Sequence, residues 1–106
     1  HVENDIKALK EIKRVLKKNA KGIVQVPFYN PIPEDTIEDK SIVSEKEREL
    51  FYGQSDHVRK YGNDYKKRLE STGLNVKVKK PNSFLRDSEI KKYCIMRSED
   101  LNIISK

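Results

Sequence analysis

The spacing of apolar residues near the start of the chain predicts an amphipathic helix over residues 4–17, followed by a short buried strand. Four apolar residues recur at intervals of three or four and so share one helix face: Ile6, Leu9, Ile12 and Leu16. The side chain of Asn4 can cap this helix by accepting a hydrogen bond from a free backbone N–H group. Residues 23–26 form a β-branched run that ends at Pro27, which predicts a strand. A helix followed by a turn and an apolar strand indicates an α/β sheet with parallel strands.

The middle of the chain predicts a long loop and then a second helix. Residues 28–43 contain prolines and a run of acids without apolar periodicity, and a loop of this length is usually functional or mobile. Ser44 and Glu47 have the spacing of a capping box, in which each side chain bonds the backbone N–H of the other. The helix that they begin is expected to end near Gly53.

The last third of the chain predicts one more helix and two strands. Asn63 is expected to cap a helix that ends near residue 71. Residues 74–79 alternate between apolar and polar side chains, the period of a half-exposed strand. Residues 90–96 contain an apolar run that predicts the final strand. Residues 98–106 are expected to form a C-terminal tail that either frays or docks through Leu101, Ile103 and Ile104.

Composition limits the chain to one modest domain and excludes several classes of protein. The chain has 106 residues, of which 35% are hydrophobic and 38% are charged, with a formal net charge of +6. Acids interrupt most of the lysine runs, so we interpret the lysines as a solvated surface and do not expect a nucleic-acid interface. The single cysteine, Cys94, excludes an internal disulfide, and no Cys/His pair has the spacing of zinc ligands. No run is long and apolar enough for a membrane span, no signal peptide is recognisable, and we expect a cytoplasmic protein.

Residues 53–62 form a polar loop with a glycine at each end, and three of its side chains are candidates for binding a ligand. His57 can orient a substrate or move a proton, or it can simply pair with Asp56. Arg59 can bind an anionic group in a bidentate manner, or it can pair with an acid of the 34–39 segment. Tyr61 can line a pocket, although a tyrosine packed beside a loop is the commoner arrangement.

Three segments together resemble the C-terminal half of the class I methyltransferases that use S-adenosylmethionine. Residues 8–17 end in Arg-Val-Leu-Lys, and residues 23–27 read Ile-Val-Gln-Val-Pro. Residues 51–62 read Phe-Tyr-Gly-Gln-Ser-Asp-His-Val-Arg-Lys-Tyr-Gly, which is similar to a loop motif of one bacterial subgroup and carries most of the specificity. The resemblance covers residues 1–97. It implies an α/β, partial Rossmann-like methyltransferase fold with about three strands and helices mainly on one face.

In the resembling fold the final strand inserts antiparallel beside the 23–26 strand, and the 74–79 strand lies at the outer edge of the sheet. The resemblance implies S-adenosylmethionine as the cofactor, with His1 near it. It also implies that the substrate side is formed by His57, Arg59 and Tyr61, close to the carboxyl end of the 23–26 strand. The methyl acceptor is unknown. Methyl transfer depends mainly on positioning, and often no general base is needed.

The glycine-rich cofactor loop of the resembling family is absent, because the four glycines of the chain form no Gly-x-Gly cluster. We therefore expect a fragment that is inactive alone and binds the cofactor weakly or not at all. An open sheet face and an unpaired strand edge would favour a homo-oligomer. The alternative hypothesis is a small basic α/β module that binds nucleic acid or a protein partner.

Overall fold

The computed structural model describes residues 1–106 and contains four α-helices, one short 3-10 helix and three strands. Their order along the chain is α1 (Asp5–Val15), β1 (Lys21–Ile23), α2 (Glu45–Tyr52), α3 (Tyr65–Glu70), β2 (Asn75–Lys79), η1 (Pro81–Ser83), α4 (Asp87–Lys92) and β3 (Leu101–Ser105). The chain is therefore mixed α/β. None of its helices has the length and apolar character that crossing a membrane requires.

The three strands form one sheet in the order β1-β3-β2, and both neighbouring pairs are antiparallel. Ile104 of β3 lies opposite Gly22 on one side and Val76 on the other. Because β1 and β2 both run against β3, they run in the same direction as each other without touching. The helix–turn–strand pattern predicted a sheet with parallel strands, which is wrong for the pairs that form, because the last strand of the chain lies antiparallel between β1 and β2.

The predictions for residues 90–106 are wrong. The predicted 90–96 strand is replaced by α4 and the turn after it, and the predicted 98–106 tail contains β3, the central strand. A local hydrogen bond favours the helix, since the carboxylate of Glu89 accepts the backbone N–H of Arg86 at 2.9 Å. Cys94 has a φ angle of 52°, which is incompatible with an extended strand at that point.

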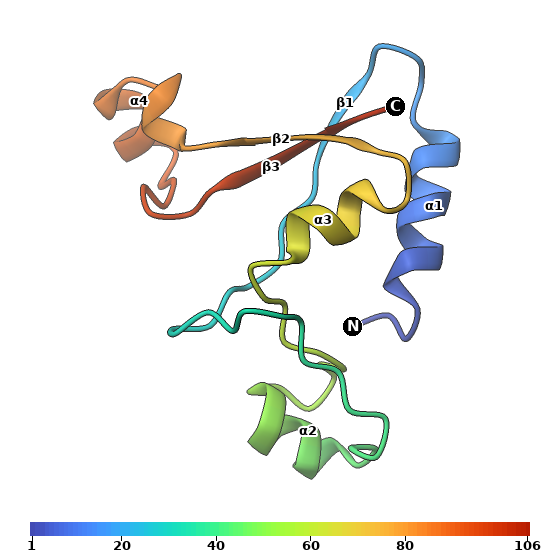
Figure 1. Cartoon of the computed structure of the whole chain (residues 1–106). Coiled ribbons are helices and arrows are strands. Elements are labelled where there is room, and N and C mark those ends of the chain that lie inside the picture. The colour runs from blue at the N-terminus through green and yellow to red at the C-terminus, as the bar shows by residue number, and fades with distance from the viewer.

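Two helices and the sheet share one small core. The buried residues that form it come from α1, α3 and β3 and from the position just before β2: Leu9, Tyr65, Leu69, Leu74 and Ile104. Figure 1 shows α1 and α3 close together beside the strands, whereas α2 projects away from the sheet. Side chains alternate along β1, so its Ile23 lies on the opposite face from Gly22 and is 62% exposed.

The signals for the starts of α1 and α2 and for the end of α2 are confirmed, whereas α1 ends at Val15 and not at Lys17. Asn4 accepts the backbone N–H of Lys7 at 2.8 Å, and Ser44 and Glu47 form the predicted capping box. Gly53 ends α2 with a φ angle of 83°, a conformation that glycine adopts without strain. The predicted cap of the third helix is wrong by one residue, because the helix is preceded by Asp64.

Candidate functional site

The 53–62 loop lies beyond the carboxyl end of β1. Tyr61 forms a parallel bridge with Phe28, which follows β1 by five residues. Lys60 pairs with Ile37 through two backbone hydrogen bonds of 2.9 and 3.0 Å. These bridges fix the loop between the segment after β1 and the acidic segment at 34–39. The loop thus lies at the end of β1 where the open α/β fold predicted it.

His57 is held in one orientation by two acceptors. Its exposed fraction is 8%, and its Nδ1 atom lies 3.1 Å from the hydroxyl of Tyr29 and 3.3 Å from the carbonyl oxygen of Tyr52. The Tyr29 hydroxyl itself donates to the Tyr52 carbonyl, so it accepts from the imidazole. A carbonyl oxygen can only accept, and these partners therefore assign the proton to Nδ1. The Nε2 atom makes no hydrogen bond within the chain.

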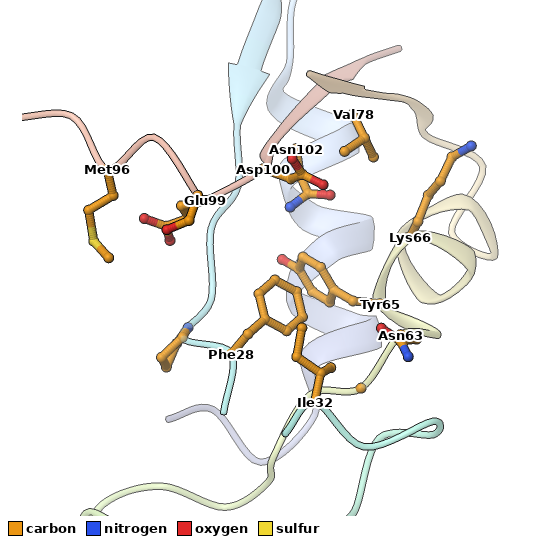
Figure 2. Close-up of a pocket in the computed structure, with 13 residues that line it drawn as sticks. Phe28, Ile32, Asn63, Tyr65, Lys66, Val78, Met96, Glu99, Asp100 and Asn102 are labelled. Atoms are coloured by element: carbon orange, nitrogen blue, oxygen red, sulfur yellow. The ribbon is translucent and has the colours of Figure 1, made fainter. Parts of the chain in front are cut away.

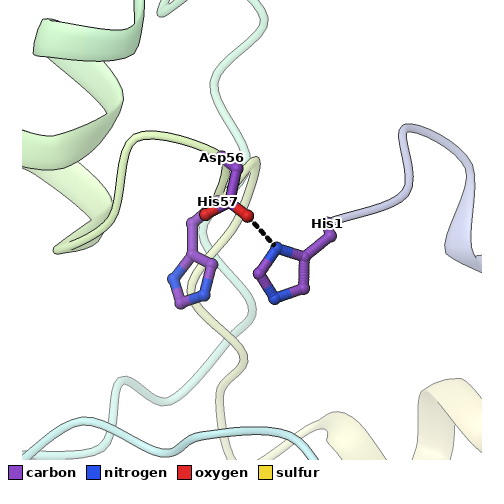
Figure 3. A group of neighbouring side chains, drawn as sticks. All are labelled: His1, Asp56 and His57. Carbon is purple, nitrogen blue, oxygen red and sulfur yellow. Dashed lines mark ion pairs between the residues drawn. The ribbon is translucent and has the colours of Figure 1, made fainter.

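His1 lies directly beside the loop. Its Nδ1 atom is 2.9 Å from a carboxylate oxygen of Asp56, and its ring meets the ring of His57 edge to face with centroids 4.7 Å apart (Figure 3). Asp56 thus pairs with His1, not with His57. The residue that the resemblance assigns to the cofactor and a residue that it assigns to the substrate are in contact, although they are far apart in sequence.

Arg59 is buried, and its two terminal guanidinium nitrogens hold the loop, whereas its Nε atom has no hydrogen-bond partner. Its side chain is 2% exposed and donates to the carbonyl oxygens of Val2 and Glu3, each at 2.8 Å. It also pairs with the carboxylate of Glu38 at 3.1 Å. Of the two roles that the sequence left open, the structure shows the pairing with the acidic segment. Arg59 therefore connects the start of the chain to both loops.

Tyr61 belongs to a second buried cluster, around Asp5. The Tyr61 hydroxyl donates to the Asp5 carboxylate at 3.0 Å, and Arg68 binds the same carboxylate with two N–H groups. Burial and the nearby negative charge of Asp5 raise the pKa of Tyr61 to about 12. The central place of Asp5 was not predicted, because an acid in the first turn of a helix ordinarily only complements the helix dipole.

A cavity of about 500 Å³ lies near the carboxyl ends of β1 and β2. Figure 2 shows the rings of Phe28 and Tyr65 beneath Asn102, with Asp100 nearby. The three loop residues predicted to bind substrate do not line this cavity. This cavity was not predicted, because Asp100 and Asn102 fall in the segment predicted to be a tail.

No protein family, no curated protein and no solved structure matches this chain.

Proposed function

We propose that this chain is the C-terminal part of an S-adenosylmethionine-dependent methyltransferase, in which it contributes the sheet edge and the substrate-side loop. The observation that carries the proposal is the strand order, with antiparallel β3 between β1 and β2. The resembling methyltransferases end their Rossmann-like sheet with this arrangement. The residues of β3 differ from those that the sequence predicted, but the order of the three strands is the expected one.

The position of the loop also supports the proposal. Ligands of open α/β sheets bind beyond the carboxyl ends of the parallel strands, which is where the 53–62 loop and the cavity lie. His57 would contact the methyl acceptor there, next to His1 on the cofactor side. Arg59 and Tyr61 would act as positioning residues, because both are engaged in buried ion-pair clusters. Positioning of this kind is the main requirement of methyl transfer.

We expect the 106-residue chain to bind S-adenosylmethionine weakly or not at all, because it lacks the Gly-rich loop and the acid that bind the cofactor in the resembling family. Calorimetric titration of the purified chain with S-adenosylmethionine measures this. Micromolar affinity would show that the cofactor site lies elsewhere than the resemblance puts it.

The proposal itself is tested on the whole polypeptide that the gene encodes. We expect a strand followed by Asp/Glu-x-Gly-x-Gly ahead of His1, and saturable binding of S-adenosylmethionine by that polypeptide. Absence of both would overturn the proposal. Retention of nucleic acid that weakens steeply with salt, without cofactor binding, would instead favour the basic binding module.

We also propose that the 106-residue chain self-associates through β1. Only β3 pairs with β1, so the other edge of β1 is free, and the side chain of Ile23 on the adjoining face is 62% exposed. Light scattering at micromolar concentration is expected to give at least a dimer, and Ile23→Lys is expected to give a monomer. The control is Val15→Lys, which changes an equally exposed residue of α1. A monomeric wild-type chain with a cooperative melt would contradict this prediction.

A further inference from the structure

We propose that His1, Asp56 and His57 form a binding site for a divalent transition-metal ion such as Zn²⁺. Each residue offers one ligand atom, and the three atoms lie within 4.8 Å of one another. Figure 3 shows the two imidazole rings and the carboxylate converging on the same space. Imidazole nitrogen and carboxylate oxygen are usual ligands of Zn²⁺, and three protein ligands leave a coordination position open. The inference goes beyond methyl transfer and does not depend on it.

The hydrogen bonds of His57 prepare it to be a ligand. A histidine that binds a metal almost always donates its second ring N–H to a carbonyl, a carboxylate or water, which fixes the ring and its tautomer. The Nδ1–H group of His57 is directed at the carbonyl oxygen of Tyr52 and the hydroxyl of Tyr29. Nε2 is consequently the free nitrogen. The ion pair of His1 with Asp56 does not itself require a second, buried imidazole whose Nδ1–H group is already hydrogen-bonded.

The geometry of the three residues allows the site to close. A tetrahedral ion with ligands at about 2 Å needs ligand atoms roughly 3.3 Å apart. The His1 nitrogen and the Asp56 oxygen are already 2.9 Å apart. Their side chains are 62% and 67% exposed, so both can rotate by the small amount needed, whereas His57 is buried and held. The site would form when two mobile ligands close on one fixed imidazole.

Such an ion would connect the start of the chain to the central loop. The carboxylate of Asp56 contributes one negative charge. Two neutral imidazoles do not cancel this charge, so it can attract a cation. The position not taken by protein can hold water or an oxygen atom of a ligand, which the ion would polarise. The chemical class of ligand is thus an oxygen donor presented beside His57.

Calorimetric titration of the chain with Zn²⁺ tests the site, with Co²⁺ as a spectroscopic probe of four-coordinate geometry. The titrated protein is prepared without a histidine tag and with a Gly-Ser extension ahead of His1. The extension prevents the α-amino group of His1 from acting as a ligand. We expect one ion per chain with micromolar affinity. His1→Gln and Asp56→Asn should each weaken binding at least about tenfold, since even loss of an outer hydrogen-bond partner costs that much.

The control is Asp87→Asn, because Asp87 is also an exposed carboxylate in an ion pair, with Arg97 at 2.8 Å. We expect this variant to bind Zn²⁺ as the unchanged chain does. His1→Gln and Asp56→Asn alter exposed side chains, so circular dichroism should show the same fold. The proposal is overturned if the unchanged chain shows no saturable binding, or if the affinity is the same in both ligand variants. Neither result depends on S-adenosylmethionine.

Discussion

Replacing Asp5 with Asn is expected to lower the free energy of unfolding by about 2–3 kcal/mol, since removing one partner of a buried ion pair leaves the other charge uncompensated. Asp5 is 5% exposed and accepts hydrogen bonds from Arg68 and Tyr61. An amide cannot accept the two parallel N–H groups of the Arg68 guanidinium. The expected loss is below the range for a fully isolated charge because Arg68 also pairs with Glu38 at 3.2 Å. Urea unfolding of the two proteins measures this loss of stability.

The matched control lies on the same helix. Glu11 pairs with Arg14 at 2.8 Å, but both side chains are more than half exposed. Exposed pairs contribute little, so Glu11→Gln is expected to change stability by less than about 0.5 kcal/mol. Equal effects of the two substitutions would show that the Asp5 cluster is not buried in solution.

The same cluster predicts how acid affects stability. Burial alone would raise the pKa of Asp5, but hydrogen bonds from Arg68 and Tyr61 and the charge of Arg59 outweigh it and hold that pKa below its ordinary value of 3.8. The unfolded chain therefore binds more protons near this pH, and stability rises with pH there. The contribution of Asp5 is present above pH 3.8 and is lost as the pH falls through the lower folded value. The stability difference between wild type and Asp5→Asn should shrink over the same range.

The sequence predicted the elements whose signals are local. The cap at Asn4 and the capping box at Ser44 and Glu47 lie within one turn of the helices that they begin, so no distant residue is needed to recognise them. The alternation over residues 74–79 likewise predicted β2, in which Val76 packs against the core although Val78 is 42% exposed. These elements depend on their own residues more than on the rest of the fold.

Strand β3 was missed because one of its buried positions is polar. Asn102 is 4% exposed, and its side chain and backbone N–H both bond the Gln25 side chain, 77 residues away. A buried asparagine looks like a loop residue until its partner is known. The apolar run after residue 92 caused the opposite error, because it predicted a buried strand where none forms. Its residues Tyr93 and Met96 are 61% and 63% exposed.

The position of the 53–62 loop was predicted, but its contacts were not. The order of helices and strands was enough to predict that the loop lies at the carboxyl end of β1. The pairing of Arg59 with an acid of the 34–39 segment was one of two stated alternatives. The contact of His1 with His57 depends on Arg59, which binds the carbonyl groups of Val2 and Glu3 and so holds the start of the chain against the loop. Spacing along the sequence carries no information about such a contact.

Gly62→Ala is expected to destabilise the chain by about 3 kcal/mol, because overpacking against rigid neighbours costs that much. A Cβ atom at Gly62 would lie 2.5 Å from the carbonyl carbon of Asp35 and 2.7 Å from the carbonyl oxygen of Pro33. Backbone atoms cannot rotate away as a side chain can. The Pro33 carbonyl is also fixed, since it accepts the N–H of Asn63 at 2.9 Å.

The control for this substitution is Gly22→Ala, whose new methyl group would meet only the Ile104 side chain, at 3.2 Å. That side chain can adjust, and alanine in a strand loses less conformational entropy than glycine, so we expect a change within about 1 kcal/mol. Urea unfolding compares the two variants, and amide exchange locates the damage. In Gly62→Ala the amides of Ile37 and Lys60 should lose protection first, because their bridge holds the 53–62 loop against the acidic segment. Protection of both amides at the wild-type level, together with unchanged stability, would show that this loop is not packed against residues 33–37. The placement of His57 beyond the end of β1 would then be wrong as well.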